Sequence, residues 1–346
     1  MRKKQSDFFS VIVPVEKLSY HLLFENIPAF EKQIFKKFEL IVLSNEHSQY
    51  DLKLLKKHSW LRIVPTGNVT KPAEKRNLGV KAARGSIIAF IDDDAYPRLD
   101  WLQEAVKKFK KSVSAVCGPG ILPENTNIWE KIFDQVITSW LGSGGYSYRF
   151  IPQKERFVDD YPSMNFLIKK KVFDKLGGFK GNYWPGEDSK LCEDLVYKLK
   201  GKILYSPKVV VYHHRRKDLK SFLKQHGNYG FHRGAFFAHG DKNSRRISYL
   251  VPTFFVGYLV FIILFSIFLL LFQLTINNQQ LAIFYLPLIF YFFYSVQLFF
   301  KTLLDNKNLL IAFLSPIVLF LTHLTYGIIF IKGFIKGFRN KNNIYD

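Results

Sequence analysis

The sequence predicts an α/β domain built on a parallel sheet, followed by an all-helical region that crosses a membrane. Two observations lead to this fold class. In the first third of the chain, short apolar runs of strand length alternate with helical patterns, as they do in βαβ units. In the last third, apolar stretches become long enough to span a bilayer. The chain has 346 residues, enough for one large domain or two modest ones.

Four short apolar runs predict the buried strands of the sheet, at residues 8–15, 38–43, 60–64 and 87–91. Helical patterns are found at residues 22–35, 52–57, 73–83 and 100–111. A more irregular part follows, with strand-like runs at 114–117, 164–168 and 209–212. A Gly-rich stretch at 141–146 is either a mobile loop or a plain connector. Parallel sheets of this type bind their ligands at the carboxyl ends of the strands.

Three consecutive aspartates, Asp92, Asp93 and Asp94, directly follow the strand at 87–91. Carboxylates gathered at a strand end indicate a cation, and ions such as Mg²⁺ are held by one or two carboxylates together with substrate phosphates. Side chains at positions i and i+2 of an extended segment point the same way. Asp92 and Asp94 can therefore face one ion, while Asp93 faces elsewhere.

Polar residues elsewhere in the chain extend this candidate site. Arg76 lies in the early turns of the helix at 73–83, where a phosphate can bind, although basic helices usually just face solvent. The acid pair Glu187 and Asp188 is either a helix cap or a general base. His213 and His214 are each either a contact for a metal or phosphate or a structural residue. Because adjacent residues of a strand point to opposite faces, at most one of the two would take part in the chemistry.

Three apolar stretches, 250–272, 281–300 and 309–331, are each long enough to cross a hydrocarbon core. Residues 236–249 form a linker before them, and residues 332–346 a basic tail. Three spans would place that tail on the face opposite to the aspartate-bearing domain, against the positive-inside tendency. The segment with Pro316 and His323 is therefore suspected of a shallow insertion, and the choice between two and three spans stays open.

The composition narrows the class of partner. A formal net charge of +22 indicates a polyanion, unless lysine is simply common in the source proteome. An anionic membrane surface is favoured over nucleic acid, because no RNA-binding pattern is found. Two cysteines, Cys117 and Cys192, exclude a disulfide framework and a zinc site, and fit a cytosolic setting. No signal peptide is visible at the amino terminus.

The order of these motifs resembles that of family 2 glycosyltransferases, enzymes of the GT-A fold (a Rossmann-like mixed sheet flanked by helices). The resemblance covers about residues 8–235. It rests on Val11-Ile12-Val13-Pro14, Arg76-Asn77-Leu78-Gly79, Phe90-Ile91-Asp92-Asp93-Asp94, Gly177-Gly178-Phe179, Gly186-Glu187-Asp188, the later His, and Gln225 with Asn228-Tyr229. It implies a GT-A domain over 1–235, with a nucleotide-sugar half at about 8–112 and an acceptor half at about 113–235.

The resemblance also implies roles for single residues. Asp188 would be the catalytic base with Glu187 beside it, and Asp92 and Asp94 would hold a divalent metal, Mn²⁺ or Mg²⁺. The residues expected to bind the donor are Pro14, Glu46, Arg76, Asn77, Asp92 and Asp93. Those expected to contact the acceptor or phosphate are Trp184, His213, His214 and Gln225. Ser44-Asn45-Glu46 replaces the usual aspartates after the second strand, so the recognition of the donor base is open.

The leading hypothesis is an inverting, metal-dependent glycosyltransferase of the cell membrane, with its catalytic domain facing the cytosol. It would move one sugar from a nucleotide-sugar donor to a lipid-linked or polysaccharide acceptor, in contact with membrane lipids and without nucleic acid. Transfer of a single sugar is favoured because the Gln-x-x-Arg-Trp of processive synthases is altered at Asn228 and Tyr229. The alternatives are a catalytically inactive scaffold of a polysaccharide assembly complex and, less favoured, a membrane nucleotidyltransferase.

Overall fold

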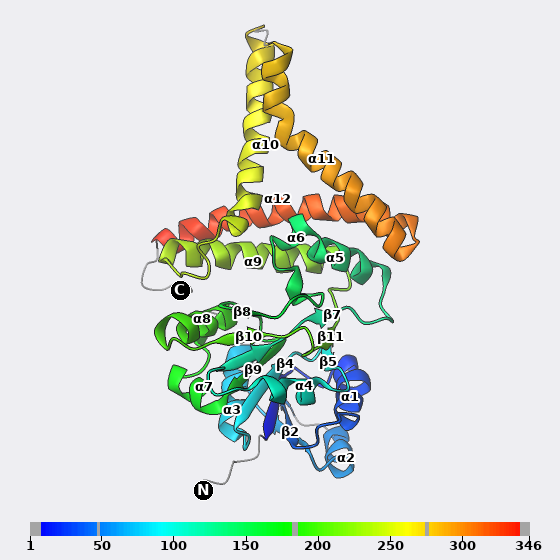
Figure 1. Ribbon diagram of the computed structural model, residues 1–346, viewed down its shortest axis with the longest axis vertical. Helices are drawn as coiled ribbons and strands as arrows, with labels where there is room; N and C mark the ends of the chain where they lie inside the picture. Colours follow the sequence, from blue (N-terminus) through cyan, green and yellow to red (C-terminus); the bar gives the residue numbers. More distant parts are fainter. Residues whose placement is uncertain (1–7, 47–48, 182–185, 274–276, 340–346) are drawn as a thin grey trace. The chain divides into compact units, whose positions relative to one another are not determined.

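The computed structural model describes residues 8–46, 49–181, 186–273 and 277–339. These residues form two compact units, which are considered separately. Unit 1 contains residues 8–124 and 148–214, and unit 2 contains residues 125–147 and 215–339. The colours of Figure 1 follow the chain through both units. The expected order, an α/β part followed by an all-helical part, is confirmed.

Unit 1 is built around an eight-stranded mixed sheet with the order β3-β2-β1-β4-β9-β6-β10-β8. The strands, in chain order, are β1 (Phe9–Pro14), β2 (Phe38–Ser44), β3 (Leu61–Pro65), β4 (Ile87–Ile91), β6 (Ala115–Cys117), β8 (Arg156–Val158), β9 (Asn165–Lys169) and β10 (Ile203–Tyr205). β1, β2 and β4 are buried along their whole length. They read as continuous apolar runs because both faces of a parallel sheet are covered.

The four strands predicted from the apolar runs, β1 to β4, do pair in parallel. The other half of the sheet is mixed, because β9 runs antiparallel to both β4 and β6. β9 thereby continues the sheet beyond β4, the strand that leads to the aspartates. A second, three-stranded sheet has the order β5-β11-β7, with β5 (Ala95–Pro97), β7 (Gly120–Ile121) and β11 (Val211–His213).

The described helices of unit 1 are short. They are η1 (Leu22–Asn26), α1 (Ile27–Glu31), α2 (Gln49–Lys57), α3 (Pro72–Ala82), α4 (Trp101–Lys108), α7 (Lys170–Leu176), α8 (Glu187–Glu193) and η4 (Asp194–Lys198). The helix predicted at 22–35 is instead a π-helical turn, η1, followed by the single short helix α1. Pro28 stands at the start of α1 and has no N–H to continue a regular hydrogen-bond ladder.

Unit 2 is all-helical. Its described helices are α5 (Ile128–Thr138), α6 (Trp140–Ser143), α9 (Leu219–His239), α10 (Ile247–Leu271), α11 (Asn278–Asn306) and α12 (Leu309–Arg339). α10, α11 and α12 are long and apolar enough to cross a membrane. The Gly-rich stretch at 141–146 begins inside α6, which ends at the left-handed Gly144 (φ +56°). The domain boundary expected at 235 falls inside α9, so unit 2 begins earlier than the expected linker.

Candidate active site

Asp92, Asp94 and His213 bring their ligand atoms within 4.8 Å of one another, a spacing that one metal ion can bridge. Asp92 and Asp94 follow the end of β4, and His213 is the last residue of β11. His213 Nε2 lies 3.2 Å from Asp94 Oδ1. The backbone also joins the two segments, because the N–H of His214 donates to the carbonyl of Asp94 at 3.0 Å. The main chain thus fixes the spacing of these ligands.

His213, the last residue of β11, and His214, the residue after it, have different side-chain partners. His214 Nε2 lies 2.9 Å from Glu25 Oε2, and His21 Nδ1 lies 2.8 Å from the same oxygen. The imidazole of His214 therefore pairs with Glu25, whereas that of His213 pairs with Asp94. Sequence reasoning missed Glu25 and His21, although a His and a Glu four residues apart share one face of a helix.

Arg76 connects the aspartates to the acid pair at the start of α8. Its Nη2 donates to Asp92 Oδ1 at 2.7 Å, and its Nη1 donates to Glu187 Oε1 at 3.0 Å. Burial works to lower the pKa of this guanidinium, but the charges of Asp92, Glu187 and Asp188 outweigh it and raise the pKa. Arg76 is a permanent, buried cation between carboxylates that come from distant parts of the chain.

Asp188 lies beside Glu187 in the first turn of α8. Its Oδ1 accepts from the backbone N–H of Ser189 at 2.8 Å, and its Oδ2 from that of Ser163 at 3.3 Å. Burial, followed by the charges of Glu187 and Asp160, raises the pKa of Asp188 to about 6. A carboxylate with such a pKa can accept a proton near neutral pH and still be largely ionised. Asp160 was not anticipated from the sequence.

Asp93, between the two aspartates of this cluster, interacts with Ser19 and with Lys75. Burial and the charge of Asp94 raise the pKa of Asp93 to about 6, and Ser19 donates a hydrogen bond to it. Lys75 is almost fully buried nearby, with its Nζ donating to Val15 O and Asn45 Oδ1. Burial lowers the pKa of Lys75, opposed by the charges of Glu16 and Asp93. Lys75 directly precedes Arg76 on α3, and no pattern in the sequence predicted that the two cations have different partners.

The remaining residues expected at the site have varied surroundings. The side chain of Asn77 binds the backbone of Phe179, which follows Gly177-Gly178. Its Nδ2 donates to Phe179 O and its Oδ1 accepts from Phe179 N, each at 2.9 Å. Pro14 ends β1, and Glu46 is exposed just beyond β2. Gln225 lies on α9 and belongs to unit 2. Trp184 lies outside the described residues.

Comparison with known proteins identifies the class of the domain that carries these residues. A family model described as "Glycosyl transferase family 2" matches residues 10–177, which include most of β1, the three aspartates and Gly177. The chain carries a family 2 glycosyltransferase domain. This glycosyltransferase is 26% identical over 344 residues to a protein of Methanococcus voltae, covering 96% of this chain and 98% of the relative. That relative is named dolichyl N-acetyl-alpha-D-glucosaminyl phosphate 3-beta-D-2,3-diacetamido-2,3-dideoxy-beta-D-glucuronosyltransferase.

Other similarities cover less of the glycosyltransferase. The pre-mycofactocin glycosyltransferase of Mycobacterium tuberculosis is 28% identical over 161 residues, which is 46% of this chain and 33% of that protein. Among solved structures, the mannosyltransferase PcManGT from Pyrobaculum calidifontis, in complex with GDP-Man and Mn²⁺, is 18% identical with a TM-score of 0.49. The similarity covers 66% of this chain and 62% of that one.

Proposed function

We propose that this glycosyltransferase is inverting and metal-dependent, and transfers one sugar from a nucleotide-sugar donor to a lipid-linked acceptor at a membrane. The observation that carries the proposal is the chain of ion pairs from the cluster Asp92-Asp94-His213 through Arg76 to Glu187, which is followed directly by Asp188 in the first turn of α8. One buried cation thereby links the proposed metal ligands to the residue beside the proposed base.

The ligand set fits a divalent ion. Two carboxylates and a neutral imidazole provide oxygen and nitrogen donors, and carboxylates suit Mg²⁺ and Mn²⁺. Asp92, Asp94 and His213 would hold the ion, which, when bound, stabilises the negative charge that develops on the leaving diphosphate. Arg76 remains paired with Asp92 and so keeps one ligand carboxylate oriented. Whether Arg76 also contacts the diphosphate remains a prediction.

Asp188 is the proposed base. It takes the proton from the acceptor hydroxyl as the hydroxyl oxygen attacks the anomeric carbon and the bond to the diphosphate breaks, which inverts the configuration. Backbone N–H groups of Ser163 and Ser189 hold the carboxylate in place, and burial together with the charge of Glu187 keeps the pKa of Asp188 high. Glu187 itself is tied to Arg76 and acts by positioning the start of α8.

The lipid-linked acceptor rests on two independent observations. The Methanococcus voltae relative, named for a dolichyl-linked acceptor, is similar along almost its full length. In addition, the described residues include three helices long and apolar enough to cross a bilayer. A catalytic domain on such an anchor works beside the headgroups of lipid-linked saccharides. A cytosolic location for the domain matches the supply of nucleotide sugars and is part of the proposal.

Sugar transfer in detergent-solubilised membranes tests the proposal. Purified protein is incubated with Mn²⁺, a panel of nucleotide sugars and a polyprenyl-phosphate-linked N-acetylglucosamine, and both the glycosylated lipid and the released nucleotide are measured. We expect nucleoside diphosphate as product, and its loss in Asp188→Asn and Asp94→Ala. Asp174→Asn is the matched control, because Asp174 is exposed on α7.

Two outcomes would contradict the proposal. Release of inorganic diphosphate would indicate a nucleotidyltransferase. Donor binding without turnover on any acceptor, unchanged by Asp188→Asn, would indicate an inactive scaffold.

A further inference from the structure

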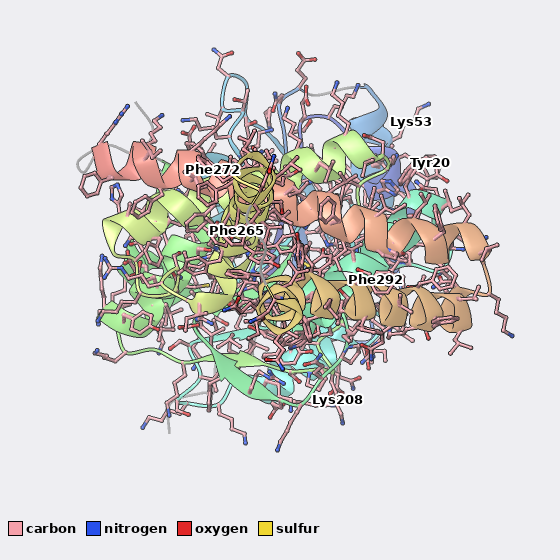
Figure 2. All side chains as sticks on the ribbon, turned by 90° about the horizontal axis from the view of Figure 1, so that it is seen from above. Tyr20, Lys53, Lys208, Phe265, Phe272 and Phe292 are labelled. Carbon is pink, nitrogen blue, oxygen red and sulfur yellow. The ribbon has the colours of Figure 1, made fainter. Side chains whose placement is uncertain are left out.

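α9 and α12 of unit 2 lie side by side and run in the same direction. Figure 1 shows them as two parallel rods, and Figure 2, turned by 90°, shows them adjacent again. α12 has a continuous buried stripe with helical spacing. Its members are Ile311, Ala312, Ser315, Val318, Leu319, Thr322, His323, Gly327, Phe330, Gly333 and Gly337.

Glycines bring the two backbones into direct contact. A Cβ added at Gly234 of α9 would lie 2.2 Å from Phe330 O of α12. A Cβ added at Gly333 of α12 would lie 1.9 Å from Phe231 O of α9. Small residues allow helices to approach this closely. Two helices whose backbones touch at several successive turns must lie at the same level relative to the bilayer. α9 and α12 are therefore either both inside the hydrocarbon core or both outside it.

α9 is too polar to lie inside a bilayer. Its 21 residues are long enough to reach across the core, but α9 is absent from the candidate spans found among the described helices. Its exposed positions include Lys220, Lys224 and Asn228, and Arg233 lies in its second half. Charged side chains in the hydrocarbon are costly and rare. α9 therefore stays outside the hydrocarbon, and α12 stays with it.

α10 supplies a second, geometric argument. In Figure 2 α10 is seen end-on, around the labelled Phe265 and Phe272, whereas α12 is seen from the side. The two helices meet at Gly327, where an added Cβ would lie 2.4 Å from Pro252 O. If α10 follows the membrane normal, α12 lies in the membrane plane. α10 is also the better candidate span, with 6% of its apolar window buried inside the protein against 39% for α12.

We infer that only α10 and α11 cross the membrane, and that α12 lies flat in the interface and binds the bilayer surface. The face of α12 opposite to the buried stripe is apolar and exposed, and would enter the boundary of the acyl chains. Its residues are Phe313, Ile317, Ile328, Ile331, Phe334, Ile335 and Phe338. A surface hollow lined by Lys332, Ile335, Lys336 and Arg339 places three cations where lipid phosphates lie.

This topology removes the conflict with the positive-inside tendency. With two spans, the residues before α10 and those after α12 lie on the same side of the membrane. The cations at the end of α12 then share that side with unit 1. The membrane path of the chain is independent of sugar transfer, and an inactive protein would have the same topology.

Cysteine labelling distinguishes the two topologies. Cys117 and Cys192 are both buried and are replaced by Ala. Single cysteines are then introduced as Gln279→Cys at the start of α11, Asp305→Cys at its end, and Asn343→Cys in the tail. Sealed vesicles are treated with a membrane-impermeant maleimide. We expect Asn343→Cys to react from the same side as Asp305→Cys and from the side opposite to Gln279→Cys. Reaction of Asn343→Cys from the Gln279→Cys side would overturn the inference.

Depth measurement tests the flat orientation directly. Fluorophores are attached at Leu310→Cys, Ile317→Cys and Ile335→Cys in the same background, and quenched by lipids with nitroxides at defined depths. Leu310 and Ile335 are about 37 Å apart along the helix, more than the ~30 Å hydrocarbon core. A flat helix gives one shallow depth at all three positions. A much deeper label at Ile317 than at the other two would contradict it, and a label on α10 at Val260→Cys provides the deep reference.

Discussion

Arg76 and Glu187 form a buried ion pair, with Nη1 3.0 Å from Oε1, although the two residues are 111 positions apart in the sequence. The same guanidinium binds Asp92. One side chain therefore connects three segments, namely α3, the aspartates after β4 and the start of α8. This arrangement makes the candidate site dependent on an arginine that need not touch the acceptor.

Replacing Arg76 by Ala should damage both stability and transfer. The change leaves Glu187 buried without its cation, and breaking a buried pair by removing one partner typically costs about 3–5 kcal/mol. Thermal unfolding in detergent, followed beside the transfer assay, measures both effects. Arg76→Lys keeps the charge but cannot bridge two carboxylates with a planar fork, and should be intermediate. An Arg76→Ala protein of unchanged stability would show that the ion pairs do not hold the site.

The pH dependence of transfer should reflect Asp188. The pKa of this carboxyl is raised to about 6, and a general base acts only when deprotonated. kcat/KM should therefore fall as pH decreases through about 6, and level off above it. Measurement at saturating Mn²⁺ between pH 5 and 8 tests this. A profile that is flat across pH 6 would contradict the assignment of Asp188 as the base.

Asp188→Asn should separate stability from activity. Because the folded-state pKa lies above the unfolded value of about 3.9, the ionised carboxylate destabilises the fold. This penalty is absent below the unfolded pKa and complete above the folded one. At pH 7 and above, Asp188→Asn should thus melt at the same or a higher temperature, while transfer falls by about 10²–10⁴-fold. A clear loss of stability at pH 8 would indicate a structural role for Asp188 instead.

The neighbouring residues His213 and His214 should behave differently when they are replaced. His213→Ala removes a ligand of the Asp92-Asp94-His213 cluster and should weaken Mn²⁺ binding about 10-fold or more, a loss of at least ~1.4 kcal/mol. Electron paramagnetic resonance of free Mn²⁺ measures this without any assay of transfer. His214→Ala removes the contact with Glu25 and should lower the melting temperature more than the Mn²⁺ affinity. Equal Mn²⁺ binding by His213→Ala and the parent protein would exclude His213 as a ligand.

Asn77→Ala tests a residue expected to bind the donor. Both amide atoms of Asn77 bond the backbone of Phe179, so the substitution should cost about 1–3 kcal/mol of stability through unsatisfied backbone groups. The KM for the donor should change little at a temperature where the variant is folded. A large rise in KM with unchanged stability would instead support the donor contact expected from the sequence.

Local patterns in the sequence were sufficient for the parallel half of the sheet. β1, β2, β3 and β4 lie close to the predicted runs. β1, β2 and β4 are apolar strands buried on both faces, which are easy to recognise, and β3 is a shorter apolar run at the edge of the sheet. β8 and β10 could not be predicted, since each has three residues and is defined by its partners rather than by its own pattern.

The candidate site was predicted in part. Asp92, Asp94 and Asp188 were recognisable from motifs, and in the structure Arg76 pairs with Asp92 and with Glu187, the residue before Asp188. Glu25 and Asp160 had no such motif, because their positions depend on which segments meet in the fold. Asn77 belonged to a motif, but only its contacts with Phe179 reveal a structural role.

The separate partners of His213 and His214 constrain the length of the chain at the end of β11. Deleting one residue between Val211 and His213 would move both imidazoles by one position, so that Asp94 and Glu25 would each lose the present partner. A change of length here would thus disturb both pairs at once, whereas a single substitution of either histidine affects one pair. Loop grafts and circular permutations of this enzyme should therefore leave the spacing from Val211 to His214 intact.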